Sequence, residues 1–336
     1  MRILIRPRWP LFALLLLAPA IPELLTGSTP ITTLFFDPLY FLIAFAGIVA
    51  LYGCGAVLIR EFVVKFHKGW ASVLLLGGAY GIVEEGLAVH TFFEPGGQTP
   101  VDNLGWYGHA LGVNWLWALG LSAFHALYSI ALPILLTQLW YPEVKNERWL
   151  DAGALGVVAA VYVFVVALFS VVVGHGPSEG LLVFFLAILA ALVILAYLVP
   201  ADLLSARPGP SRIGSWGLAI DGAVFFSAWT FVLILATSGG RVSAWVAGLV
   251  LAAVSLGSLV VVLRRVGTEN LDRSKFYFAT GMLGILFAWD VIVEFTIPGI
   301  LLVTAVFVYL LYRLHRTLLA RERSRVPPGV AQPRST

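Results

Sequence analysis

The sequence predicts an all-α polytopic integral membrane protein with about ten transmembrane helices. Of its 336 residues, 60% are hydrophobic and 12% are charged, whereas soluble domains are about 45–50% apolar and about 25% charged. Apolar residues run continuously over about 18 or more positions at a time, the length of a membrane-spanning helix. No segment shows the alternation with a period of two that a transmembrane barrel needs. The composition therefore excludes a soluble enzyme, a disordered protein and a nucleic-acid-binding module.

Short polar joints divide the apolar sequence into ten expected spans. These are residues 10–27, 39–59, 70–92, 113–139, 152–174, 181–199, 216–237, 242–263, 276–297 and 299–314. They form one expected transmembrane domain over residues 1–320. Residues 321–336 are basic and contain proline, and we expect a disordered cytoplasmic tail that contacts anionic membrane lipid. The single cysteine, Cys54, excludes a disulfide framework and a thiolate zinc site.

The basic residues predict the orientation of the chain. If the N-terminus is cytoplasmic, 20 of the 21 Lys and Arg residues lie in inner segments, and Arg241 is the exception. Cytoplasmic loops of membrane proteins carry an excess of Lys and Arg. We therefore expect an even number of spans, with both termini in the cytoplasm. The positive charge is then a topology signal, and membrane lipid, not nucleic acid, is the expected partner.

The first span allows two interpretations. Residues 1–8 are basic, residues 11–20 form a short apolar core, and Ala18-Pro19-Ala20 resembles a cleavage site, which together are typical of a signal peptide. The same segment also fits a transmembrane helix, and we prefer that interpretation. Cleavage would leave the other nine spans oriented as before.

Four carboxylates and one histidine lie deep in these apolar spans. An ionisable group inside a bilayer costs several kcal/mol unless it is paired, protonated or hydrated, so each marks a candidate functional site. At about 1.5 Å per residue, Glu84, Glu85 and Asp290 lie about 21 Å from the inner face. Glu294 lies about 27 Å from that face. His125 enters from the outer side and reaches the middle of the membrane, about one turn deeper than the glutamates.

The spacing of these residues predicts how they are arranged. Asp290 and Glu294 are four residues apart, so both project from one helix face and could hold one ion or share a proton. The two adjacent glutamates point about 100° apart on an α-helix, and we expect both to face the interior. Gly77 and Gly81 lie below Glu84, and this small-residue pair lets another helix approach closely. The sequence thus predicts a shared acidic and histidine site in the outer half of the membrane.

Part of the chain resembles a group of uncharacterised prokaryotic multispanning membrane proteins. The similar blocks are residues 23–30, 51–61, 69–87 and 111–136, within a region of about residues 10–145. The resemblance implies a bacterial or archaeal plasma-membrane protein without an assigned activity. It also favours keeping the first helix, because the block that begins at Glu23 follows directly from it.

The acidic pair carries a second resemblance, to the CAAX-protease and bacteriocin-processing family of intramembrane glutamate-dependent proteases. That family has an EExxxR motif, an FxxxH motif some forty residues later, and then HxxxN or HxxxD. Glu84 and Glu85 match the glutamate pair, and His125 follows Glu84 by 41 residues. The resemblance implies that these three residues are catalytic.

Three positions depart from the pattern of that family. Val89 stands where EExxxR has arginine, and Leu121 stands where FxxxH has phenylalanine. The downstream histidine at a suitable distance, His175, has Glu179 in place of Asn or Asp.

These observations leave three functions open. The first is cation- or proton-coupled transport, or binding of a small ion, at Glu84, Glu85, His125, Asp290 and Glu294. The second is hydrolysis of a membrane-embedded substrate, with a glutamate as the base that activates water and His125 orienting it. A divalent metal ion such as zinc or manganese is compatible with either, because carboxylates and imidazole suit these ions. The third is a structural or assembly protein whose buried acids are protonated.

Overall fold

The computed structural model describes residues 8–93, 107–174, 176–237 and 242–325, which form a bundle of helices. Nine helices in these ranges are long and apolar enough to cross a membrane. They cover Pro38–Lys65, Trp70–Ala88, Trp115–Trp140, Ala152–Val173, Glu179–Leu198, Ser215–Val232, Ala244–Arg265, Leu271–Val293 and Ile300–Ser324. The prediction of an all-α polytopic membrane protein is confirmed, and each of these helices coincides with one expected span.

The long helices of the N-terminal half combine α-helical turns with wider π-helical turns. They are α3–η2–α4 (Pro38–Ile48, Val49–Gly53, Cys54–Lys65), α5–η3 (Trp70–Gly81, Ile82–Ala88) and α6–η4–α7 (Trp115–Phe124, His125–Ala131, Leu132–Trp140). The later helices are α8 (Ala152–Val173), α9 (Glu179–Leu198), α10 (Ser215–Thr237), α11 (Ala244–Arg265), α12 (Leu271–Val293) and α13 (Ile300–Arg325). The short elements are α2 (Thr33–Phe36), the 3₁₀ turn η5 (Pro142–Val144) and an antiparallel pair of strands, β1 (His109–Ala110) and β2 (Val113–Asn114).

The first expected span, residues 10–27, forms a shorter apolar helix over Trp9–Leu24. It consists of α1 (Arg8–Pro19) and a π-helical end, η1 (Ala20–Leu24). Leu14, Ala18 and Ile21 are completely buried, and α1 packs against η2 and α7. This segment is therefore part of the protein core.

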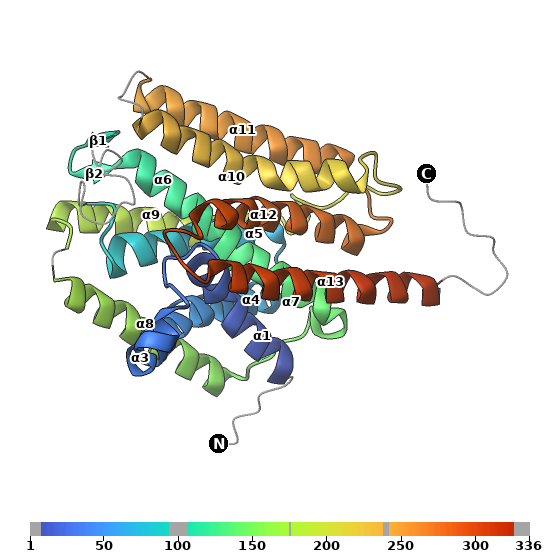
Figure 1. Cartoon of the computed structure of the whole chain (residues 1–336), viewed down its shortest axis with the longest axis horizontal. Coiled ribbons are helices and arrows are strands. Elements are labelled where there is room, and N and C mark those ends of the chain that lie inside the picture. The colour runs from blue at the N-terminus through green and yellow to red at the C-terminus, as the bar shows by residue number, and fades with distance from the viewer. Residues whose placement is uncertain (1–7, 94–106, 175, 238–241, 326–336) are drawn as a thin grey trace.

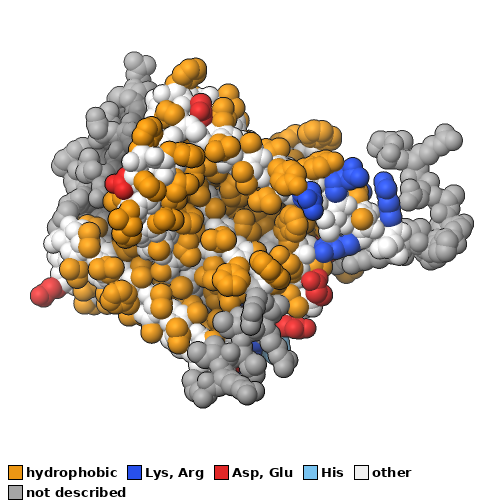
Figure 2. Space-filling view, turned by 60° about the horizontal axis from the view of Figure 1, so that its bottom comes forward, with side chains coloured by type: hydrophobic (Ala, Val, Ile, Leu, Met, Phe, Trp, Pro, Cys, Tyr) orange, Lys and Arg blue, Asp and Glu red, His pale blue; other side chains and the backbone are white. Residues whose placement is uncertain are grey.

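The bundle has buried central helices and exposed outer ones (Figure 1). Most residues of α5–η3 and of α6–η4–α7 are buried, because glycines and alanines allow these helices to approach closely. In contrast, α8, α9 and α11 each bury only two residues. Figure 2 shows one face covered mainly by hydrophobic side chains, with Lys and Arg gathered toward one end. This surface suits contact with lipid.

The last helix corrects the expected boundary of the tail. The predicted span ended at residue 314 and the predicted disordered tail began at residue 321, but α13 continues to Arg325. Leu314 and Leu318 are buried against the core, and the Arg321 guanidinium donates to the carbonyls of Leu139 and Trp140. These contacts extend the helix beyond its apolar run. Residues 326–336 lie outside the described residues.

The structure also corrects the placement of Arg60, which the topology argument assigned to an aqueous inner segment. Arg60 and Glu61 lie inside α4, each only 1% exposed, and form an ion pair. The guanidinium stacks over the Trp149 ring at 3.6 Å and donates to the carbonyls of Val144 and Lys145. Arg60 therefore holds the connection between α7 and α8 against α4.

Candidate functional site

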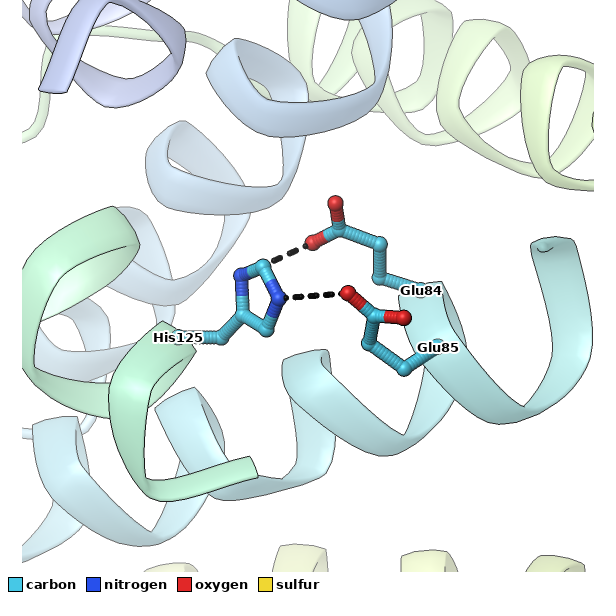
Figure 3. A group of neighbouring side chains, drawn as sticks. All are labelled: Glu84, Glu85 and His125. Carbon is cyan, nitrogen blue, oxygen red and sulfur yellow. Dashed lines mark hydrogen bonds and ion pairs between the residues drawn. The ribbon is translucent and has the colours of Figure 1, made fainter. Parts of the chain in front are cut away.

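The glutamate pair and His125 come from π-helical segments of two helices that pack against each other, α5–η3 and α6–η4. Glu84 and Glu85 lie in η3, and His125 is the first residue of η4. The wider π turn directs adjacent side chains closer together than an α turn would, and such turns are frequent at functional sites. Both glutamates therefore reach the same histidine (Figure 3). The Cβ atom of His125 lies beside Gly81, about one turn before the glutamates, as expected.

Two glycines bring the helices together, as the sequence predicted. A Cβ atom added at Gly77 would lie 2.7 Å from the Cα atom of Ala126. One added at Gly81 would lie 2.7 Å from the Cα atom of Ser122. No side chain larger than hydrogen fits between these backbones, so the contact fixes the position of α6–η4 relative to α5.

The imidazole of His125 contacts both carboxylates (Figure 3). Its Nε2 atom lies 3.0 Å from Glu85 Oε1, and its Nδ1 atom lies 2.9 Å from the Ser129 hydroxyl. Glu84 Oε2 is 3.1 Å from Nδ1 but has no hydrogen bond of good geometry among the described residues. Glu84 and His125 are each 3% exposed. Three ionisable groups therefore meet in a nearly dry helix contact.

Neighbouring side chains hold Glu84, Glu85 and His125, here called the triad, in place. The Thr91 hydroxyl donates to Glu85 Oε2. The rings of Tyr52 and Tyr80 lie 5.9 Å and 6.0 Å from the His125 ring, measured between centroids. The Tyr80 hydroxyl is buried and has no hydrogen-bond partner in the described part of the chain.

Glu23 is a further acid near the triad that sequence reasoning did not select. Its carboxylate accepts hydrogen bonds from the hydroxyls of Tyr52, at 2.6 Å, and Thr29, at 2.7 Å. Glu23 lies near the end of the first expected span, residues 10–27, and is not among the deep carboxylates predicted from the sequence. No sequence signal marks Tyr52, because an aromatic residue in an apolar helix is usually a core residue.

The protonation of His125 decides the electrostatics of the triad. If a neutral imidazole carries its proton on Nδ1 and donates to Ser129, the Nε2 lone pair faces Glu85 Oε1 at 3.0 Å. If the proton is on Nε2, Glu84 Oε2 has no donor and lies beside a bare Nδ1. With both carboxylates ionised, either neutral tautomer leaves one ring nitrogen without a proton beside a negatively charged carboxylate oxygen. The geometry therefore calls for an additional proton or another cation.

Asp290 and Glu294 do not join this group, which corrects the prediction of one shared site. Among the described residues, one set of at least three His, Cys, Asp or Glu side chains has ligand atoms within 4.8 Å of each other, and it consists of Glu84, Glu85 and His125. The helix α12 packs against α7, α10 and α13 instead of η3. Equal expected depth along the helices thus did not imply proximity.

The second acidic pair has separate roles in the structure. Asp290 is completely buried and accepts a hydrogen bond from the Thr304 hydroxyl of α13. Glu294 accepts from the backbone N–H groups of Gly299, at 2.9 Å, and Leu301, at 3.0 Å. These two donors hold the pKa of Glu294 below its ordinary value. Glu294 therefore caps the start of α13 and is not positioned to clamp an ion together with Asp290.

The described site contains one imidazole and two carboxylates. The hydroxyl groups of Ser129 and Thr91 are hydrogen-bonded to His125 and Glu85. Such a set can bind a proton or a metal ion, or activate a water molecule. His175, the downstream histidine of the protease resemblance, lies outside the described residues. No family model matches the chain, and no curated protein or solved structure matches it.

Proposed function

We propose that this protein is a multi-pass plasma-membrane protein that binds a cation, a proton or a metal ion, in the outer half of the bilayer. Its function would be cation- or proton-coupled transport or binding. The observation that carries the proposal is the pair of contacts that His125 makes with Glu84 and Glu85, at 3.1 Å and 3.0 Å. Neither neutral tautomer satisfies both contacts without a further positive charge.

The charges around the triad support the same conclusion. In the parts of the chain that the structure describes, both ion pairs of these glutamates are with His125. Two ionised carboxylates and an imidazolium still carry one net negative charge. Removing such a group from water is expensive unless the charge is compensated. A bound cation, or a proton taken up in exchange for one, supplies that compensation.

Proteoliposomes that contain the purified protein and a pH-sensitive dye test this function. We expect a proton flux that depends on an imposed cation or pH gradient, and we expect its loss in Glu85→Gln and His125→Ala. Asp221→Asn is the matched control, because Asp221 is another buried carboxylate, bound to Ser258 of α11. Equal flux from wild-type protein, both site variants and empty liposomes would end the proposal.

Hydrolysis of a membrane-embedded substrate is the second candidate, and one contact favours it. Glu85 is hydrogen-bonded to His125, whose other ring nitrogen is held by Ser129, an order typical of a general base with an orienting group. The resemblance to glutamate-dependent intramembrane proteases points in the same direction. Here Glu84 or Glu85 would activate water and His125 would orient it or stabilise the oxyanion.

Cleavage of fluorogenic transmembrane peptides in detergent separates the two candidates. Turnover that is lost in Glu84→Gln, Glu85→Gln and His125→Ala, without any gradient-dependent flux, would assign the site to hydrolysis. If both assays are negative for folded protein, the triad has a structural role between the helices.

A further inference from the structure

We infer that the triad is a binding site for a divalent transition-metal ion of the zinc class, held by His125 Nε2, Glu85 Oε1 and a carboxylate oxygen of Glu84. This inference rests on the proposed function and names its cation. It goes beyond an acidic cluster because His125 and Glu85 are each held by a hydroxyl group at the atom that would not bind the ion. Glu84 adds a buried oxygen that has no hydrogen bond among the described residues.

The first observation concerns what holds the ligands from behind. Ser129 engages Nδ1 of His125, and Thr91 engages Oε2 of Glu85. The remaining donor atoms, Nε2 and Oε1, therefore face each other at 3.0 Å. Metal-binding histidines almost always use one ring nitrogen for the ion and donate the other N–H to a fixed partner, and ligating carboxylates are held in the same way. The triad has both of these supports.

The second observation is that buried polar atoms at the site lack partners. Glu84 Oε2 has no hydrogen bond among the described residues although Glu84 is only 3% exposed. The hydroxyl of Tyr80, also 3% exposed, is likewise without a partner there, and its ring lies against His125. Buried polar groups are nearly always satisfied by protein, water or an ion. A bound ion with one water molecule would engage both atoms.

The spacing of the donor atoms fits a small dication. The three ligand atoms lie within 4.8 Å of one another. Bonds of about 2.0–2.2 Å to His and carboxylate ligands place neighbouring ligand atoms about 3.3 Å apart around a tetrahedral ion. Small side-chain shifts would close the site on an ion, and the fourth position would remain for water.

The donor chemistry selects the class of ion. Calcium and magnesium prefer sites made of oxygen atoms alone, whereas imidazole suits zinc, iron, copper and nickel. One nitrogen and two carboxylate oxygens therefore favour zinc, or cobalt as its spectroscopic substitute. Two carboxylates also neutralise the charge of a dication within the apolar surroundings.

Metal analysis of the full-length protein in detergent tests the inference. Protein stripped with a chelator is dialysed against Zn²⁺ or Co²⁺, separated from free metal, and examined by elemental analysis and by visible absorption of Co²⁺. We expect about one ion per chain, retained in excess Mg²⁺ or Ca²⁺. We also expect at least about a 100-fold loss of affinity in Glu84→Gln, Glu85→Gln and His125→Ala, beyond the roughly 10- to 100-fold loss typical of supporting residues.

Two variants outside the site serve as controls. Asp221→Asn removes a buried carboxylate of α10, and His315→Gln removes a histidine that stacks on Phe276. Both should bind metal as the wild type does. Thermal unfolding of every variant separates a lost ligand from a lost fold.

The flux assay distinguishes failure of this inference from failure of the proposed function. If the wild type retains no more metal than His125→Ala, the metal assignment is overturned. If proton flux is nevertheless lost in Glu85→Gln, the cation function stands with protons as the ion. If metal and flux are both unaffected by the three substitutions, both proposals fail.

Discussion

At the residue scale, the chemistry of the site depends on one histidine, because both ring nitrogens of His125 have polar neighbours, Ser129 at Nδ1 and Glu85 at Nε2. Ser129 lies four residues after His125, one turn along the same helix, and its hydroxyl is 2.9 Å from Nδ1. This contact sets the rotation of the ring, and the hydroxyl would accept a hydrogen bond from Nδ1–H when a metal ion occupies Nε2. Ser129 is thus a positioning residue and not a ligand.

We expect Ser129→Ala to weaken cation binding by about 2- to 10-fold, because a hydrogen bond contributes about 0.5–1.5 kcal/mol. The measurement is a titration of the purified protein with Co²⁺ or with protons. Ser72→Ala is the control, since Ser72 is equally buried but donates to the Ala196 carbonyl away from the site. Equal affinities of the two variants would remove Ser129 from the site.

At the element scale, two irregular helices and a glycine contact build the site. The π-helical segments η3 and η4 widen the helices where the ionisable groups lie. Gly77 and Gly81 allow the backbones to touch one and two turns before the glutamates. The local sequence thus places the acids, and the helix contact brings the histidine to them.

We expect Gly81→Ala to destabilise the protein by about 1–3 kcal/mol, the usual cost of overpacking a tight contact, and to weaken cation binding. Gly78→Ala is a closely matched control, because a Cβ atom there meets nothing within 4 Å. Alanine is favoured over glycine in helices by about 1 kcal/mol, so Gly78→Ala should be neutral or stabilising. Unfolding in detergent measures both changes, and similar behaviour of the two variants would contradict the packing argument.

At the scale of the whole molecule, the exposed apolar helices and the distribution of charge describe a protein immersed in lipid. The outer helices α8, α9 and α11 bury only two residues each. The basic residues of the chain alternate with the spans as the topology argument requires, with 20 of 21 in expected inner segments. We therefore propose that both termini are cytoplasmic.

Cysteine labelling measures this orientation. In a Cys54→Ser background, Asp202→Cys lies in an expected inner segment and Glu179→Cys lies in an expected outer one, and both positions are exposed. We expect an impermeant maleimide to label Glu179→Cys in intact cells and Asp202→Cys only in inverted vesicles. The reverse labelling pattern would mean that the chain has the opposite orientation in the membrane, with the triad in the inner half.

The sequence by itself determined the membrane class, the all-α fold, the nine long spans and the five deep ionisable residues that include the triad. Each of these follows from local information. A long apolar run must form a helix in lipid, because its backbone groups have no other partners, and an ionisable side chain within such a run stands out. The glycine pair below Glu84 likewise predicted a close helix contact.

Only the tertiary structure decided which of the deep charges meet. It separated Asp290 and Glu294 from the triad, brought Glu23 and Tyr52 beside it, and buried Arg60 under Trp149. The physical reason is that the lipid-facing and core-facing surfaces of a helix are both apolar. Close packing at small residues and hydrogen bonds between helices therefore decide which helices become neighbours. The pattern along one helix therefore gives the depth of a charge, whereas its neighbours depend on how all the helices pack.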